Sequence, residues 1–541
     1  MIIRSRALAY VLVTLLVIIT GCTVDQPAPR PGANRAPSEA PAASPAPLPS
    51  VGPGGPNARS SDRPIEPVPR VQIPGLTSPP PGHGLARYAG QKIDWKLCGV
   101  AGDETKQCAT VLAPLDYQHP DKIAITLAIA RRPSEAEHPK GMIFANPGGP
   151  GASGVDFLDG FDDHGLNKAY DLVSWDPRGT GRSTPVHCLT DRQMDTYVAA
   201  DYSPQTAQQT QQLININTAF GRACLARSGE LLQHISTADT VRDLDLLRQL
   251  LGQHRLDYLG FSYGTSIGAM YATIFGDRVG HMVLDGATSV GGRPRVSQED
   301  GFDRTLRNFA TWCASKNCEL GSSRQQVLAS ISDFLRGLDR HPLAAGPRSL
   351  TQSLGTSGLT YALYFPATDW PQLLGGLELA IDAHDGSQLL AWSDAYYERD
   401  NSGHYGQFNA AFPAILCLDE PEGGPAAALK AWRRDEHRAP TLGPFIGPDL
   451  TCATWPVRST GDTQKKISYT GRTPIVILGT TGDPATPYED AQHMHRALAS
   501  SRLVTLDGDG HLAFDQSACV QAKVLAYFDR GVTPRDSRCT R

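Results

Sequence analysis

The sequence predicts an α/β fold, in which a mostly parallel, doubly wound sheet is interrupted by an inserted, mainly helical cap. Several short apolar runs are bounded by Gly, Pro or Asp, which is typical of strands buried on both faces of a parallel sheet. These runs are residues 142–145, 172–175, 282–284 and 475–478. Between them, apolar positions from 241 to 251 follow helical spacing behind Thr237 and Asp239, either of which could cap that helix. Strands that alternate with helices in this way form a doubly wound sheet.

Size and charge exclude two broad classes of protein. The chain has 541 residues, 40% of them apolar, with 50 Lys and Arg against 55 Asp and Glu and a net charge of −5. This balance provides no basic surface for nucleic acid, so no nucleic-acid partner is expected. The chain also lacks the repeated apolar stretches of ~20 residues that a multispanning membrane protein needs. We therefore expect a folded protein with a large core.

The N-terminus has the organisation of an export signal. Arg4 and Arg6 precede the apolar run 7–19, which is too short to span a bilayer and is followed by Thr-Gly-Cys. A cysteine in this position resembles the lipobox of bacterial lipoproteins, in which the cysteine is lipidated and becomes the first residue. We therefore predict a signal peptide over residues 1–21, lipidation of Cys22 and an extracytoplasmic protein anchored to the bacterial cell membrane. The alternative is an ordinary cleaved signal in which Cys22 occurs by chance.

Residues 22–84 are expected to form an extended spacer between the lipid anchor and the folded part. Residues 27–83 contain 17 of the 42 prolines, mixed with Ala, Ser and Gly, and show almost no apolar periodicity. A segment of this composition cannot bury enough surface to fold. At about 3.1 Å per residue in polyproline geometry, it could hold the folded part tens of Å from a membrane.

The remaining ten cysteines predict disulfides, because an even number of cysteines in an exported chain indicates an oxidised framework. Neighbour pairing is the simplest connectivity, although the sequence does not prove it. It would join Cys98 to Cys108, Cys188 to Cys224, Cys313 to Cys318, Cys417 to Cys452, and Cys519 to Cys539. Metal binding is the alternative. The chain contains neither Cys-x-x-Cys nor His-Glu-x-x-His, so no metal is expected.

The folded part divides into a core and a cap. Residues 85–288 contain most of the strand-like runs, including a half-exposed strand over 123–129, and are predicted to form the first part of the core. Strand-like runs disappear from 289 to 469, where aromatic residues are frequent, and this segment predicts a helical cap with its own core. Residues 470–541 are predicted to form the C-terminal part of the same α/β core.

Ser262 is the predicted nucleophile. The run 257–264 reads Asp-Tyr-Leu-Gly-Phe-Ser-Tyr-Gly and contains Gly-x-Ser-x-Gly between a strand and the helical run 265–275. This is the setting of a nucleophile elbow, a tight strand-to-helix turn in which the residues around the serine must be small. A serine hydroxyl needs an imidazole to take its proton, and that imidazole needs a carboxylate to fix its tautomer.

Asp483 and His511 are the predicted partners of Ser262, because the chain order in enzymes with such an elbow is serine, acid, histidine. Asp483 follows the strand-like run 475–482, at the edge where active sites of open α/β sheets form. Thr486 is close enough to donate a hydrogen bond to this pair, and the alternative is that it only starts the next helix. His511 lies in a Gly-Asp-Gly-His loop after another strand-like run.

Four other residues compete for these roles. Asp507 and Asp509 are alternative acids, but they lie next to His511 and not at the end of a strand of their own. His493 and His495 lie on a helix that is predicted to start near Tyr488, which favours surface or packing roles for them.

The oxyanion hole is predicted from two backbone amides, one after the nucleophile and one in the loop after an early strand. Tyr263 supplies the first. The run Asn-Pro-Gly-Gly-Pro-Gly at 146–151 supplies the second, with Gly149 as the first choice and Gly148 as the alternative. These glycines also fit a dinucleotide motif formally, but Pro150 removes a donor and acidic residues follow, so no cofactor is expected.

Together these motifs resemble those of secreted bacterial tripeptidyl aminopeptidases in the proline-iminopeptidase-related branch of the α/β-hydrolases, most closely the mycobacterial and streptomycete members. Besides 146–151 and Gly-His at 510–511, the matching runs are Asp-Pro-Arg-Gly-Thr-Gly-Arg-Ser at 176–183, Tyr-Leu-Gly-Phe-Ser-Tyr-Gly-Thr at 258–265, Ala-Ile-Leu-Cys-Leu-Asp at 414–419 and Gly-Asp-Pro-Ala-Thr-Pro-Tyr at 482–488. They span nearly all of the folded part in the same order. The resemblance implies the α/β-hydrolase fold and release of short peptides, typically tripeptides, from a free N-terminus.

An exopeptidase of this type needs a negative group to pair with the substrate α-ammonium. Asp419 and Glu420 are the candidates, and an exposed acidic turn is the alternative interpretation. Asp176 and Arg178 are instead expected to form a structural ion pair.

Three functional hypotheses remain open from the sequence. The first is an exopeptidase that takes a peptide or protein substrate and forms an acyl-enzyme on Ser262. A carboxylesterase or lipase would use the same triad, and a surface-binding lipoprotein with an inactive triad is the third hypothesis. The sequence predicts no oligomeric state.

Overall fold

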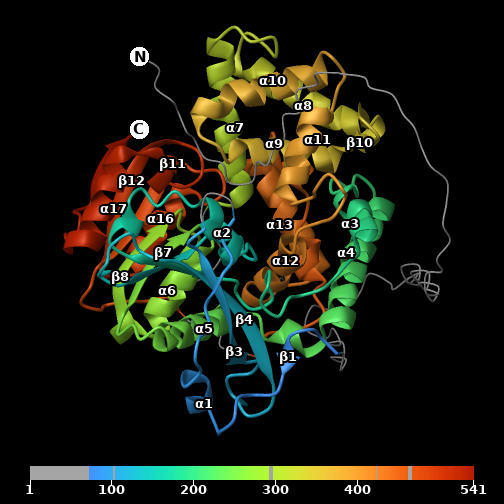
Figure 1. The fold of residues 1–541 in the computed structure, drawn as a ribbon. Helices are drawn as coiled ribbons and strands as arrows, with labels where there is room; N and C mark the ends of the chain where they lie inside the picture. Colours follow the sequence, from blue (N-terminus) through green and yellow to red (C-terminus); the bar gives the residue numbers. More distant parts are fainter. Residues whose placement is uncertain (1–71, 101–103, 291–295, 422, 461–465) are drawn as a thin grey trace, which may run out of the picture. The chain divides into compact units, whose positions relative to one another are not determined.

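The computed structural model describes residues 72–541, except 101–103, 291–295, 422 and 461–465. The predicted signal peptide, Cys22 and most of the predicted spacer therefore lie outside the described residues. The described chain contains an 11-stranded sheet with the spatial order β13-β12-β11-β8-β7-β5-β6-β4-β3-β2, and β1 pairs with β4 (Figure 1). The strands are β1 Leu76–Thr77, β2 Lys96–Leu97, β3 Gln107–Pro114, β4 Ala124–Arg132, β5 Met142–Asn146, β6 Asp171–Trp175, β7 Leu256–Phe261, β8 Val279–Asp285, β11 Ile475–Gly482, β12 Ser501–Asp509 and β13 Ser537–Thr540.

Neighbouring strands from β6 to β13 in this order are parallel. The antiparallel pairs are β1 with β4, β2 with β3, β3 with β4, and β4 with β6. The residues of β5, β6, β7 and β8 are nearly all buried. Helices on both faces explain this burial, and hence why continuous apolar runs marked these strands. The strand predicted to be half-exposed over 123–129 is β4, which is largely buried because it lies between β3 and β6.

Helices cover both faces of the sheet. A Cβ on Gly268 of α6 would lie 2.4 Å from the Leu284 side chain of β8, so α6 packs closely on that face. His281 of the same strand points to the opposite face, where its ring packs edge-on against Tyr527 of α17. The core helices are α1 Ala86–Ala89, α2 Gly154–Gly160, α5 Thr237–Leu250, α6 Gly264–Ile274, α16 Tyr488–Ala497 and α17 Ala518–Arg530. Ser236 caps α5 by accepting from the Asp239 N–H, so the predicted caps Thr237 and Asp239 are wrong by one to three residues.

A helical cap is inserted between β8 and β11, and Figure 1 shows its helices grouped apart from those that flank the sheet. The α/β class with a mostly parallel sheet and a helical insertion is therefore confirmed. The helices of the insertion are α7 Gln298–Ser315, α8 Arg324–Arg340, α9 Gln352–Leu363, α10 Trp370–Ile381, α11 Ser387–Tyr396, α12 Phe408–Asp419, α13 Pro425–Arg438, α14 Gly443–Ile446 and α15 Leu450–Ala453. Strands β9 (Leu343–Ala345) and β10 (Arg348–Leu350) form a hairpin within it.

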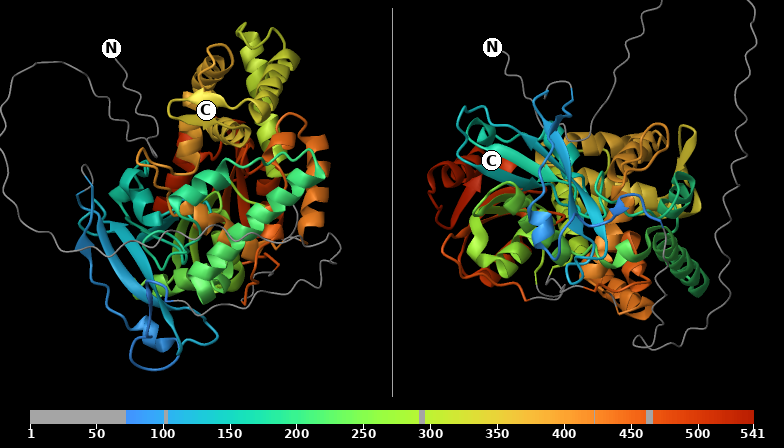
Figure 2. Two further views of the ribbon diagram at one scale, coloured as in Figure 1. Left: turned by 90° about the vertical axis from the view of Figure 1, so that its right-hand side faces the viewer. Right: turned by 60° about the horizontal axis from the view of Figure 1, so that its bottom comes forward.

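Two helices from the earlier part of the chain pack against this cap. They are α3 (Asp191–Val198) and α4 (Ala207–Ser228), which Figures 1 and 2 show beside the helices of the insertion. Asp195 of α3 accepts hydrogen bonds from the Arg399 Nε and the Tyr405 hydroxyl, both at 2.8 Å. This stretch belongs to the segment 85–288 that is predicted as core, because nothing in its helical pattern distinguishes a helix on the sheet from one on the cap.

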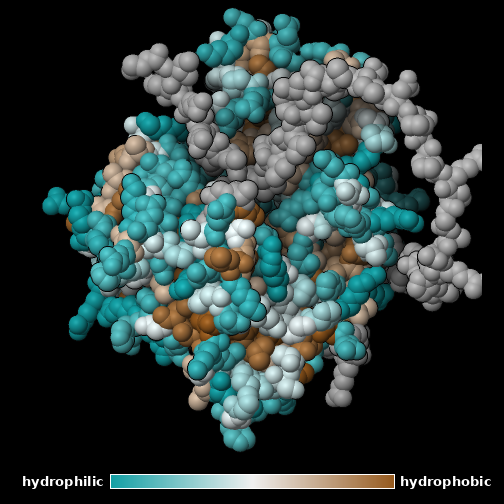
Figure 3. Space-filling model, in the orientation of Figure 1, coloured by the Kyte–Doolittle hydropathy of each residue, from teal (hydrophilic) through white to brown (hydrophobic). Residues whose placement is uncertain are grey.

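The described cysteines form five disulfides, and each joins neighbours along the chain as in the simplest predicted pairing. None of the described helices is both long enough and apolar enough to cross a membrane. The face drawn in Figure 3 is mostly hydrophilic where it is coloured, with hydrophobic residues in scattered groups.

The predicted ion pair between Asp176 and Arg178 is wrong. Arg178 is fully buried, and its Nε and Nη2 each donate to a carboxylate oxygen of Asp243 in α5 at 2.7 Å. The guanidinium also donates to the carbonyl oxygens of His234 and Leu115. Its N–H groups therefore find acceptors on α5 and on the loops around it. Asp176 points instead toward the start of α2, where unpaired amides need an acceptor.

Candidate active site

Ser262 lies in a strained turn between β7 and α6. Its φ is +52°, a left-handed conformation that is unusual for a residue with a side chain. A Cβ on Gly260 would lie 2.5 Å from the Gly264 carbonyl oxygen, and a Cβ on Gly264 would lie 2.8 Å from the Asn146 carbonyl oxygen. Only glycine fits at these two positions, as a nucleophile elbow requires.

Asp483 lies directly after β11 with its carboxylate held by the backbone. Its Oδ1 accepts the amides of Ala485 at 2.9 Å and Thr486 at 2.8 Å, and its Oδ2 accepts the Leu512 amide at 3.1 Å. The residue is 1% exposed. These three donors fix the orientation of the carboxylate before any substrate is present.

The structure brings His511 to Asp483. The His511 Nδ1 lies 2.9 Å from Oδ1 and 3.0 Å from Oδ2 of Asp483, and 3.3 Å from the Thr486 hydroxyl. A carboxylate accepts only, so Nδ1 carries the proton and Nε2 is left as the base. Thr486 thus contacts both partners, through its hydroxyl and through its amide.

The competing acids and histidines lie elsewhere. Asp507 pairs with Arg538, and the Asp509 carboxylate accepts from Asn308 at 2.6 Å. His495 lies on α16, where its Nδ1 is 2.8 Å from the Ser501 hydroxyl. His493 lies on the same helix, as expected from the sequence.

The glycine loop after β5 lies against the elbow. A Cβ on Gly148 would lie 2.5 Å from the Phe261 carbonyl oxygen and 3.0 Å from the Tyr263 nitrogen, so glycine is required for this approach. The Gly148 amide is already used, since it donates to Asn146 Oδ1 at 3.0 Å. The amides of Gly149 and Tyr263, in contrast, donate to no other group of the described chain. This difference favours Gly149 over Gly148 as the donor to an oxyanion.

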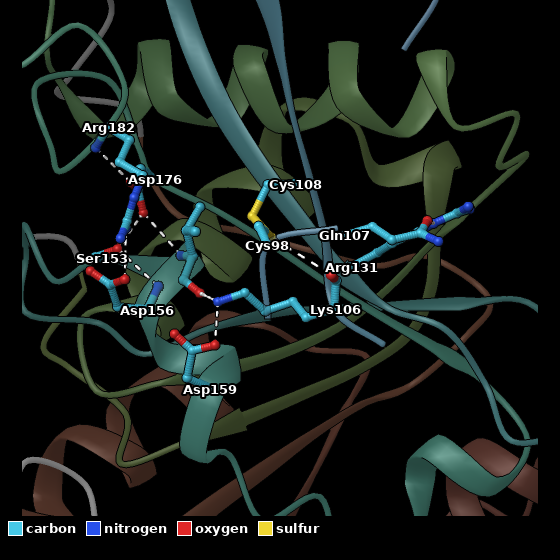
Figure 4. Close-up of a disulfide and its surroundings, with 11 residues drawn as sticks. Cys98, Lys106, Gln107, Cys108, Arg131, Ser153, Asp156, Asp159, Asp176 and Arg182 are labelled. Atoms are coloured by element: carbon cyan, nitrogen blue, oxygen red, sulfur yellow. Dashed lines mark hydrogen bonds and ion pairs between the residues drawn. A yellow bond between two sulfur atoms is a disulfide. The ribbon is translucent and has the colours of Figure 1, made fainter. Parts of the chain in front are cut away.

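Helix α2, which follows the glycine loop, is held at both ends (Figure 4). At its start, Asp176 accepts from the Ser153 hydroxyl at 2.6 Å and from the Val155 amide at 3.0 Å. The buried Lys106 donates to the Val155 carbonyl in the first turn at 3.0 Å and pairs with Asp159 near the end of the helix. These contacts fix α2 and with it the position of the glycine loop.

Comparison with known proteins agrees with this geometry. The alpha/beta hydrolase fold family matches residues 142–518. The chain belongs to this family. It is 33% identical to Serine protease Hip1 of Mycobacterium tuberculosis over 486 residues, which covers 83% of this chain and 92% of that protein. It is 38% identical to Carboxylesterase B of M. tuberculosis over 456 residues, which covers 80% of this chain and 86% of that protein.

A third relative carries the name of the group that the motifs resemble. The chain is 30% identical to Tripeptidyl aminopeptidase of Streptomyces lividans over 482 residues, covering 84% of this chain and 88% of that protein. The resemblance to the tripeptidyl aminopeptidase group is therefore confirmed, and the protein is a serine hydrolase.

The cap of this hydrolase reaches both the base and the oxyanion side of the site. Tyr364, at the end of α9, accepts the His511 amide on its carbonyl at 2.8 Å and packs its ring edge-on against the imidazole. Asp419, at the end of α12, accepts the Thr237 amide at 3.0 Å and the Thr237 hydroxyl. That hydroxyl also bonds the phenol oxygen of Tyr263, the residue after the nucleophile.

The two predicted ammonium-binding residues have different surroundings in this hydrolase. The Asp419 carboxylate is occupied by Thr237, and burial raises its pKa to about 7. Glu420 is exposed. A third carboxyl, Asp490 of α16, is 6% exposed and has no hydrogen bond or ion pair of its side chain within the described ranges. Burial, followed by the negative charges of Glu489, Asp483 and Glu420, raises the pKa of Asp490 to about 7.

Sequence reasoning missed three residues of this site: Tyr364, Asp490 and Asp285. Asp490 and Tyr364 gave no signal, because each is an ordinary residue of a helical segment. Asp285 did give one, since it is a carboxyl residue at the end of the strand-like run 282–284, on the same edge as Asp483.

Proposed function

We propose that this hydrolase is an extracytoplasmic serine exopeptidase that releases short peptides, typically tripeptides, from free N-termini. The observation that carries the proposal is the Asp483–His511 hydrogen bond, together with the strained elbow at Ser262 and a cap that contacts the catalytic histidine. Similarity to a serine protease and to a tripeptidyl aminopeptidase favours a peptide substrate.

The proposed reaction starts at Ser262. Its Oγ attacks the carbonyl carbon of the scissile bond while the His511 Nε2 accepts the hydroxyl proton, and Asp483 stabilises the imidazolium that forms. The amides of Gly149 and Tyr263 donate to the oxyanion. His511 then gives its proton to the leaving amine, which departs and leaves the released peptide esterified to Ser262. Water, deprotonated by His511, hydrolyses that ester and restores the serine.

The free N-terminus would be recognised by carboxylates under the cap. An α-ammonium is attracted to negative charge most strongly where water is excluded. Because Asp419 is occupied by Thr237, Glu420 and the unpartnered Asp490 are the better candidates in the described chain. Burial and then the neighbouring negative charges raise the pKa of Asp490, and a cation bound beside it would favour its ionised form.

Carboxylesterase activity is the second candidate, and similarity to Carboxylesterase B is the observation that favours it. The same triad can also hydrolyse an ester, whose alcohol leaves more easily than an amine, if the groove admits it. A surface-binding lipoprotein with an inactive triad is the third, and the Asp483–His511 hydrogen bond argues against it.

An extracytoplasmic, lipid-anchored location is part of the proposal. Five disulfides are typical of an exported protein, and a Pro-rich spacer would hold the enzyme away from its anchor. Cys22→Ser should release the protein from the membrane fraction or prevent its processing. A variant that is processed and stays membrane-bound would exclude Cys22 as the lipid site.

One substrate panel tests the proposal. Chromogenic tripeptides with free or acetylated N-termini would be compared with di- and tetrapeptides and with small acyl esters. We expect cleavage of free tripeptides in preference to acetylated ones, and Ser262→Ala should lower kcat on the order of 10⁴-fold or more. Equal hydrolysis of free and acetylated peptides would exclude an aminopeptidase, and activity on esters alone would support the carboxylesterase. Absence of fluorophosphonate labelling at Ser262 would indicate an inactive triad.

A further inference from the structure

We propose that Asp285 is a positioning residue that fixes the His511 loop against Ser262 through hydrogen bonds to both segments. The proposal rests on the proposed triad and adds a residue that contacts neither the substrate nor the reacting atoms. Asp285 is the last residue of β8 and lies beside Phe261 of β7 in the parallel register, so it ends at the level of the elbow. Its side chain is fully buried.

Asp285 forms hydrogen bonds in two directions. Its carbonyl oxygen accepts the Ser262 amide at 2.8 Å. Its carboxylate accepts the Ala513 amide on Oδ1 and the Phe514 amide on Oδ2, both at 2.9 Å. The two donors lie two and three residues after His511, so one strand end sets the spacing between the nucleophile and the loop of the base.

The next residue shows how closely the loop is packed here. Gly286 has a φ of +66°, and a Cβ on it would lie 3.1 Å from His511 Cε1 and 2.7 Å from Leu512 Cδ2. The imidazole and Leu512 thus leave no room for a side chain directly after Asp285. A small movement of the loop would therefore change the position of the ring.

The other supports of the loop do not replace Asp285. Tyr364 holds the His511 amide from the cap, and Asp483 holds the Leu512 amide from β11. Ala513 and Phe514 are both fully buried, so without Asp285 their amides would lose their acceptor where water does not reach. The loop would have to move to satisfy them.

A carboxylate at this position also affects the charge of the site. Burial raises the pKa of Asp285 to about 7, the two amides lower it, and of the neighbouring charges Asp515 raises it and His511 lowers it. When His511 takes the proton of Ser262, ionised Asp285 is favoured. It then stabilises the imidazolium together with Asp483.

Asp285→Asn separates these effects from folding. The amide side chain keeps the volume but has one acceptor oxygen, and its NH₂ group would face a second N–H donor. We expect kcat/KM to fall on the order of 10–100-fold, the range for losing a hydrogen bond to a charged group, with KM nearly unchanged. The loss should appear in kcat, because the variant changes the position of the base and leaves the substrate groove intact.

Asp303→Asn is the matched control. Asp303 is fully buried and accepts two consecutive amides, those of Thr441 at 2.8 Å and Leu442 at 3.0 Å, but it lies in the cap on α7. This variant should lower the melting temperature comparably and leave kcat nearly unchanged. An Asp285→Asn enzyme whose kcat matches the wild type would overturn the proposal. So would an equal fall of kcat in both variants, since that would indicate a general loss of stability.

Hydrogen exchange provides a test that needs neither a folded variant nor a substrate. In the wild-type protein the amides of Ala513 and Phe514 should be strongly protected, and Asp285→Asn, where folded, should lose that protection locally. Fast exchange at both amides in the wild type would overturn the proposal. A wild type that hydrolyses no substrate and takes no fluorophosphonate label would instead refute the proposed function, while the exchange result would still decide the positioning.

Discussion

Asp483→Asn offers the sharpest test of the triad, because the structure shows what each oxygen of this carboxylate does. Oδ1 accepts the amides of Ala485 and Thr486, and Oδ2 accepts that of Leu512, while both lie within 3.0 Å of the His511 Nδ1. An asparagine keeps one acceptor. If its oxygen stays with the two amides on the Oδ1 side, its NH₂ group replaces Oδ2 beside the imidazole.

That NH₂ group would favour the wrong tautomer of His511, with Nδ1 as the acceptor and the proton on Nε2. An imidazole in that form cannot take the proton of Ser262, so kcat should fall on the order of 10⁴-fold. The Leu512 amide also loses its acceptor, which should cost roughly 1–3 kcal/mol of stability. Steady-state kinetics on the best substrate and chemical denaturation would measure the two effects separately.

Asp507→Asn is the control, since Asp507 competes with Asp483 in the sequence but pairs with the exposed Arg538 in the structure. Its kcat should stay within about twofold of the wild type, as for a surface pair. The reasoning would be refuted if Asp483→Asn kept kcat within about tenfold of the wild type, because losing the orienting carboxylate should cost far more. A large loss in Asp507→Asn would instead assign the acid to Asp507.

Three further predictions concern charged side chains. Asp490 has a pKa of about 7 against 3.8 for an ordinary aspartate, so the folded state binds its proton more tightly and stability falls as pH rises from about 4 to 7. Asp490→Asn should therefore raise the free energy of unfolding by roughly 1–4 kcal/mol at pH 8 and leave it unchanged at pH 4; equal effects at both pH values would contradict this. Arg178→Met should cost about 3–5 kcal/mol, because it leaves Asp243 charged and buried, and adding Asp243→Leu should recover much of the loss in denaturation measurements. Asp419→Asn should lower kcat for free tripeptides and small esters alike, whereas Glu420→Gln should raise KM for free tripeptides only; the reverse pattern would return ammonium binding to Asp419.

The sequence predicted the sheet well because its signals are local. Burial on both faces requires continuous apolar runs, and those at 142–145 and 475–478 became β5 and the start of β11. Gly-x-Ser-x-Gly has meaning in a strand–turn–helix setting, which two short stretches of sequence define. Asp483 and His511 followed from the same rule, since each comes after a strand that ends at the active edge.

Pairings between distant segments were not predictable in this way. Arg178 and Asp243 are 65 residues apart, and nothing in the sequence showed that α5 would bring the carboxylate to this arginine. The packing of α3 against the cap depends on contacts such as Asp195 with Arg399, more than 200 residues away. Asp285 could have been singled out as a carboxyl group at a strand end, but the sequence gave no reason to look for two amides beyond His511.

The cap of this enzyme is better regarded as part of the catalytic site than as a cover over it. It supports the base, because the Tyr364 carbonyl binds the His511 amide, and it supports the oxyanion side, because Asp419 binds Thr237 beside the Tyr263 phenol. Both contacts join cap residues to groups that must hold their positions in the transition state. A change in cap position would therefore alter kcat as well as substrate binding. For this reason the choice between peptide and ester substrates should depend on how each substrate contacts the cap, since the same triad can attack the carbonyl of either bond.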